Sequence, residues 1–143
     1  MNTTETPPRK RPGWVLAISI FYFISIFFGA AALLLTYTGT LPIEEGDRAY
    51  LDSLTIIDHL ITGVFLLAGL AGTTAFLLLK KTSYYIFCAL VVMDVCSYAW
   101  HILQKDWITA IGGPGAIGAI IGLAINVCVC LYARSLIKRG ILV

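Results

Sequence analysis

The chain contains few charged residues for its length. Of its 143 residues, 13% are charged and 59% are hydrophobic, whereas a soluble domain carries about 25% charged residues. This composition excludes a protein whose surface is dissolved in water, so most of the surface must face lipid. The basic residues do not form an extended basic region, which argues against a nucleic-acid-binding protein.

The sequence also lacks the motifs of common enzyme chemistry. The glycine-rich stretch at 112–115 (GGPG) is not followed by Lys-Ser or Lys-Thr, so it is not a phosphate-binding loop. No Ser-His-Asp set is indicated by spacing, and none of the four cysteines forms a CxxC pair. Cys128 and Cys130 project about 200° apart on a helix, which favours neither a chelate nor a disulfide. These absences favour a protein without catalytic residues, and we predict no cofactor.

Long apolar runs are the main positive feature. A run of about 24 residues rises roughly 36 Å as a helix, enough to cross a bilayer. The first run exceeds the apolar region of a signal peptide, so we interpret it as a retained span. The sequence predicts an all-α, four-helix transmembrane domain at 14–137, between a disordered basic segment at 1–13 and a tail at 138–143. The predicted spans are 14–37, 54–79, 84–104 and 116–137.

The distribution of basic residues predicts the topology. Eight lie on one side of the predicted membrane and two, Arg48 and Lys105, lie on the other. Because basic loops stay in the cytoplasm, we expect an antiparallel up-down-up-down bundle with both termini cytoplasmic. The eight are Arg9, Lys10, Arg11, Lys80, Lys81, Arg134, Lys138 and Arg139.

Small residues recur four apart in two of the predicted spans. In membranes such patterns let two helix backbones approach closely. We therefore expect helix packing at Ala68-x-x-x-Gly72 and Gly69-x-x-x-Thr73 in the second span, and at Gly118-x-x-x-Gly122 in the fourth.

Asp94 lies near the middle of the third span. A carboxylate at the centre of a bilayer costs roughly 2.5–3.5 kcal/mol on insertion scales. Tyr98 and His101 follow at i+4 and i+7, so they share one helix face with Asp94. The predicted topology places further polar residues toward the outer side or at the depth of Asp94. The full candidate set is Asp94, Tyr98, His101, Asp58, His59 and Asn126.

Two interpretations of this polar strip remain open. In the first, it lines a cavity open to the outer side, with Asp94 as a proton acceptor or a counter-ion and His101 as a proton relay. In the second, the residues form interhelical hydrogen bonds, with Asp94 ionised or protonated. Asp58 and His59 project about 100° apart, so we predict no metal site. Haem ligation by His59 and His101 has no further support.

The region from Leu54 to Tyr98 resembles a broad class of small, mostly uncharacterised bacterial four-helix inner-membrane proteins. The resemblance is carried by Asp58-His59 at the start of the second span, by its glycine-rich middle, and by the LLLKKTSYYIF junction. It implies a compact four-helix bundle in a bacterial inner membrane. It implies no activity and no site residues.

Three functions are consistent with this sequence. The first is an accessory, regulatory or interaction subunit that packs on other membrane-protein subunits or forms a homo-oligomer. The alternative is an oligomeric transporter or channel in which Asp94 is the proton or cation coupling group. A further alternative is a membrane protein that binds a lipid, a quinone or haem.

Overall fold

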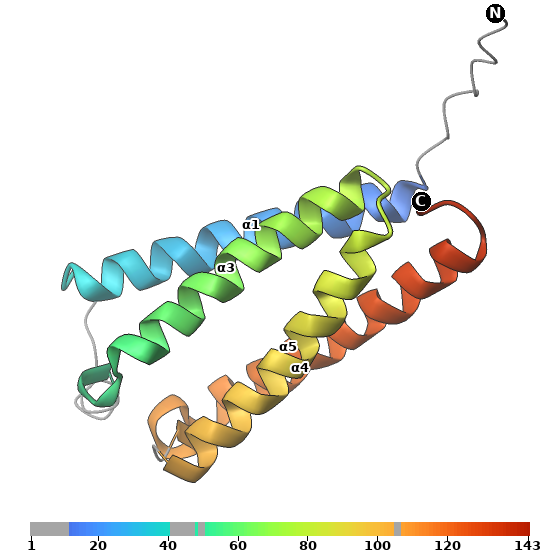
Figure 1. The fold of residues 1–143 in the computed structure, drawn as a ribbon. Coiled ribbons are helices and arrows are strands. Elements are labelled where there is room, and N and C mark those ends of the chain that lie inside the picture. The colour runs from blue at the N-terminus through green and yellow to red at the C-terminus, as the bar shows by residue number, and fades with distance from the viewer. Residues whose placement is uncertain (1–11, 41–47, 49–50, 105–106) are drawn as a thin grey trace, which may run out of the picture.

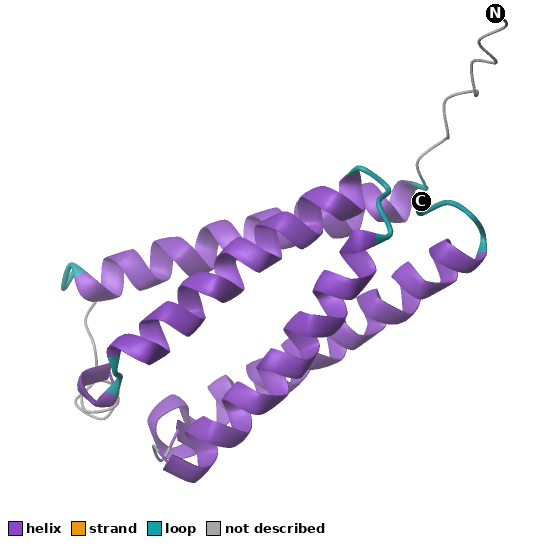
Figure 2. Ribbon diagram, in the orientation of Figure 1, coloured by secondary structure: helices purple, strands orange, loops and turns teal. Residues whose placement is uncertain are grey.

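Four long helices make up most of the chain. The computed structural model describes residues 12–40, 48, 51–104 and 107–143, and in these residues it is helical without strands (Figure 2). Each long helix is apolar enough and contains a segment long enough to cross a membrane, so the chain is a multi-pass membrane protein. The helices are α1 (Gly13–Tyr37), α3 (Ile56–Leu77), α4 (Thr82–Gln104) and α5 (Trp107–Lys138).

The predicted spans agree with these helices except at the fourth. Helix α3 begins two residues later than predicted, since Thr55 and Asp58 form a capping box at its start. At the fourth, α5 begins at Trp107, but the part that can span a membrane is Gly115–Lys138, close to the predicted 116–137. Two helical stretches meet at Gly112, whose φ of 63° and ψ of −179° are accessible essentially to glycine alone. The backbone therefore leaves the helical conformation at Gly112.

The helices form two layers that diverge from one end. The main interfaces join α1 with α3, α3 with α4, and α4 with α5. In Figure 1 the α1–α3 layer meets the α4–α5 layer beside the α3–α4 turn, where the described chain also begins and ends. The two layers spread apart toward the opposite end of the helices.

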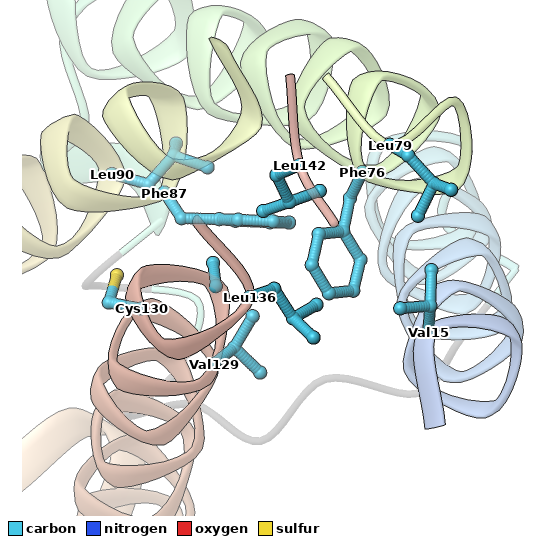
Figure 3. Packing of buried hydrophobic residues seen from close by; sticks show 10 residues of the cluster. Val15, Phe76, Leu79, Phe87, Leu90, Val129, Cys130, Leu136 and Leu142 are labelled. Atoms are coloured by element: carbon cyan, nitrogen blue, oxygen red, sulfur yellow. The ribbon is translucent and has the colours of Figure 1, made fainter. Parts of the chain in front are cut away.

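The buried core lies almost entirely at the converging end (Figure 3). We call residues 12–22, 67–91 and 127–143 the packed half, and residues 23–37, 56–66, 92–104 and 115–126 the open half. Asp58 is the one buried residue among those described in the open half. The core cluster consists of Val15, Phe76, Leu79, Phe87, Leu90, Val129, Cys130, Ala133, Leu136 and Leu142.

The segment predicted as a tail contributes to this core. After α5 the chain folds back, and Leu142 is fully buried. The Val143 amide donates to the Leu79 carbonyl at 2.9 Å, and the Lys81 amide donates to the Val143 carbonyl at 2.8 Å. These two bonds fix the C-terminal segment against the turn between α3 and α4.

The predicted small-residue contacts divide between the two halves. A Cβ at Gly72 would lie 2.9 Å from Ile86 Cγ2, and one at Gly69 would lie 3.2 Å from Ile26 Cδ1. Ala68 packs against the core, and Thr73 is buried. Gly118 and Gly122 contact no other described helix, since a Cβ at either would meet none of the described atoms within 4 Å. Close packing in this chain is therefore confined to α3 and its neighbours.

Candidate functional site

A hydrogen-bonded chain of three side chains crosses the middle of the molecule. Asn126 Nδ2 on α5 donates to Asp94 Oδ2 on α4 at 2.8 Å. The Tyr22 hydroxyl on α1 donates to Asn126 Oδ1. All three side chains are half-buried. The Asn126 amide thus uses both of its ends to connect α1 to α4.

This arrangement gives the carboxylate of Asp94 a fixed polar partner at membrane depth. Interhelical hydrogen bonds in membranes contribute about 0.6 kcal/mol on average and up to about 1.7 kcal/mol. The Asp94–Asn126 bond is therefore a modest stabilising contact that also reduces the cost of burying the carboxyl group. Tyr98 follows one turn beyond Asp94 and is half-buried.

A second polar pair joins α3 to α4 in the open half. Asp58 Oδ1 lies 4.0 Å from His101 Nε2, and the Asp58 side chain is 7% exposed. The other carboxylate oxygen, Oδ2, accepts from the Thr55 amide at 2.7 Å and from the Thr55 hydroxyl at 2.8 Å. Asp58 therefore caps the start of α3 and also faces an imidazole on the neighbouring helix.

His59 lies apart from this pair. Its Nδ1 is 2.9 Å from the Tyr37 hydroxyl on α1, and the two rings are nearly perpendicular with centroids 5.3 Å apart. Asp58 and His59 are neighbours in a helix, so they project toward different partners. The polar residues thus form separate groups, and the single strip that included His59 was a wrong expectation.

A small cavity of about 220 Å³ lies beside the Asp58–His101 pair between α3 and α4. Its wall combines Asp58, Ser97 and His101 with the aromatic rings of Phe65 and Trp100. A carboxylate near aromatic faces is suited chemically to a small cation. The described residues contain no group of three or more His, Cys, Asp or Glu side chains placed to hold a metal ion.

Sequence reasoning missed Tyr22, Tyr37 and Thr55. Tyr22 lies about 14 Å along α1 from its start, and Asn126 lies about 18 Å from the end of α5. If the start of α1 and the end of α5 lie at the same membrane face, Tyr22 and Asn126 lie at similar depths. A comparison of depths could therefore have paired them. Thr55 and Asp58 have the spacing of a capping box, a local signal that was present in the sequence.

Two buried hydroxyl groups add to the polar content of the packed half. Ser19 Oγ on α1 and Thr73 Oγ1 on α3 have no hydrogen-bond partner among the residues that the structure describes. Both side chains are 1% exposed. Burying these hydroxyl groups without a partner costs free energy, which the apolar contacts of the packed half must offset.

No protein-family model, curated protein or solved structure gives a match to this chain. Its function is therefore inferred from its own geometry.

Proposed function

We propose that the protein is an accessory or interaction subunit of a larger membrane assembly, with its open half as the surface that receives helices of other subunits. The observation that carries this proposal is a set of small residues without neighbours. Among the described residues, no atom of a neighbouring segment lies within 4 Å of a Cβ placed at Gly29, Gly63, Gly118 or Gly122. Glycine in a helix interior costs roughly 0.5–1 kcal/mol relative to alanine, and small residues in membranes mark close helix contacts.

The contrast with Gly69 and Gly72 supports this interpretation. Those two glycines lie in contact with Ile26 and Ile86 of neighbouring helices, so the chain uses glycine for close packing where its helices meet. The same residue type recurs in the open half on α1, α3 and α5 without a neighbour. Helices of another subunit would supply the missing contacts.

The proposed orientation has four antiparallel spans in a bacterial inner membrane, with both termini and the packed half on the cytoplasmic side. Lys80, Lys81, Arg134, Lys138 and Arg139 all belong to the packed half, and basic residues favour the cytoplasmic side. The open half then reaches the outer side, where the Asp58–His101 pair lies.

The environment of Asp94 favours this function over a transporter. A coupling group must exchange its proton or ion during transport, whereas Asp94 is bonded to Asn126, which is itself bonded to Tyr22. Such a chain of bonds suits a fixed connection between helices. The transporter alternative requires that Asp94→Asn abolish ion or solute flux in liposomes.

Copurification with a double variant tests the interaction surface. In a mild detergent extract of native membranes, we expect the chain to copurify with a stoichiometric membrane-protein partner. Gly118→Leu with Gly122→Leu should reduce partner recovery about tenfold or more, because overpacking costs about 1–3 kcal/mol. Ala71→Leu is the control, since it adds the same side chain at an exposed position of the packed half.

The proposal fails if the chain is recovered as a clean monomer, or if the double variant retains its partner as well as Ala71→Leu does. Thermal unfolding of the isolated double variant serves as a check on folding. The double variant should be no less stable than the unmodified chain, because no described atom lies within 4 Å of the added Cβ atoms and replacing a helical glycine favours the helix.

A further inference from the structure

An apolar groove runs between α1 and α5, from the packed half into the open half. Its volume is about 580 Å³. Helices α1 and α5 do not share one of the main interfaces, so their facing sides leave this space open at the surface. The walls are formed chiefly by Trp14 and Ile18 from α1 and by Ile121, Ile125, Cys128 and Tyr132 from α5.

The length of the groove matches one leaflet of a bilayer. Its α5 wall follows positions 121, 125, 128 and 132, which form a single stripe on a helix. From 121 to 132 the helix rises about 16 Å, and half of the hydrocarbon core is about 15 Å. A hydrocarbon chain of one leaflet has about the length of this stripe.

The end of the groove nearest the C-terminal segment leads to a cation. Arg139 continues the same stripe seven residues after Tyr132, and its amide donates to the Ser135 carbonyl at 3.1 Å, so the helical turn extends through it. The Arg139 side chain is exposed. Trp14, on the α1 wall, is 73% exposed, as expected of an aromatic side chain at a membrane interface.

The charged side chains described in the packed half are all basic. Its described residues include Lys80, Lys81, Arg134, Lys138 and Arg139 but no Asp or Glu. Basic clusters next to spans on the cytoplasmic side attract anionic lipid head groups. The groove therefore combines an apolar channel with basic residues beyond its end nearest the C-terminal segment.

We propose that this groove binds one anionic phospholipid, with an acyl chain along the α5 stripe and the phosphate at Arg139. The lipid belongs to the leaflet beside the α3–α4 turn, which the proposed topology makes cytoplasmic. The lipid preference can be tested apart from the partner surface, because Arg139 lies roughly 25 Å along the helix from Gly122. Arg139→Gln should therefore lose the lipid preference and retain the partner.

Native mass spectrometry of the full chain released from lipid nanodiscs tests the site. We expect one phosphatidylglycerol to remain bound per chain, with about fivefold or greater preference over phosphatidylcholine. Arg139→Gln should reduce that preference about fivefold, the effect of one basic residue near a membrane surface. Arg134→Gln is the matched control, because Arg134 lines a different groove between α4 and α5.

A second variant tests the apolar part of the groove. Cys128→Phe fills the channel and should reduce retention of both lipids, whereas Val95→Phe, at an exposed position that lines none of the described pockets, should not. If Cys128→Phe does not fold, Arg139→Gln still decides, since it lies beyond the end of α5.

Three results would overturn the proposal. Equal retention of phosphatidylglycerol and phosphatidylcholine would remove the anionic preference. If Arg139→Gln and Arg134→Gln reduced the preference for phosphatidylglycerol equally, the anionic lipid would be attracted by the overall basic charge and not by a site at Arg139. A lipid-free dimer that Cys128→Phe disrupts would assign the groove to a second copy of the chain.

Discussion

The two halves of this molecule are stabilised by different kinds of contact. In the packed half, Phe76 meets Phe87 edge to face with ring centroids 5.7 Å apart and contacts Tyr132 at 6.4 Å. In the open half, the described polar links between helices include Asp94–Asn126, Asp58–His101 and Tyr37–His59. The packed half is stabilised by close apolar packing, and the open half is stabilised by a few polar contacts. We therefore expect mutations in the packed half to have the larger effects on stability.

The same difference separates the residues that stabilise the fold from the residues that leave helix surface uncovered. In lipid, apolar side chains gain little by leaving a hydrocarbon solvent, and helices associate through close packing and hydrogen bonds. Such packing is present around Phe76 and Gly72 and is absent around Gly118 and Gly122. The packed half therefore holds the chain together, whereas the glycines of the open half remain uncovered by the described residues.

The largest effect should come from the aromatic core. Phe76→Ala should lower the free energy of unfolding by about 3–5 kcal/mol, because it leaves a cavity between Phe87, Leu136 and Leu142. Phe27→Ala, at a 70% exposed position of the open half, should change it by less than about 0.5 kcal/mol. Unfolding by SDS titration in mixed micelles measures both values, and equal effects would abolish the distinction between the halves.

A smaller effect should follow from adding one methyl group at a glycine. Gly72→Ala places its Cβ 2.9 Å from Ile86 Cγ2, so we expect a loss of about 1–3 kcal/mol from overpacking. Gly63→Ala meets nothing within 4 Å and should stabilise the helix by up to about 1 kcal/mol. The same titration compares them, and a loss of stability in Gly63→Ala would show that the open half is packed after all.

The smallest effect should lie at the boundary between the halves. A double-mutant cycle of Asp94→Leu and Asn126→Leu should give a coupling energy of about 0.6–1.7 kcal/mol, the range of interhelical hydrogen bonds in membranes. The coupling isolates the 2.8 Å bond from the other effects of each substitution. A value of zero would remove Asp94 and Asn126 from the contacts that hold α4 to α5.

Much of the helical architecture was predictable from the sequence. Apolar runs longer than a bilayer is thick predict spans in any context, and the four helices fall within a few residues of the predictions except at the start of α5. The contact of Asp94 with Asn126 was suggested by their equal depth. These predictions depend on length and composition, which a sequence displays directly.

The remaining features depend on how the helices rotate and diverge. Depth along a helix does not specify which neighbour a side chain faces, so the sequence did not show that His59 faces Tyr37 while Asp58 faces His101. A small-residue pattern does not specify whether its partner lies in the same chain, so the sequence did not show that Gly118 and Gly122 contact no other described helix. Gly112 could be identified as a helix breaker, but its kink angle depends on tertiary contacts.

The C-terminal segment has a consequence for how the protein is made. The core includes Val15 from the first helix and Leu142 from beyond the last, and residues 79–81 pair with Val143. The stretch from Val15 to Leu142 must be synthesised before this core closes. During translation, α1 and α3 therefore enter the membrane with their Val15 and Phe76 sites uncovered. In that interval a chaperone or insertase has access to a surface that the finished protein hides.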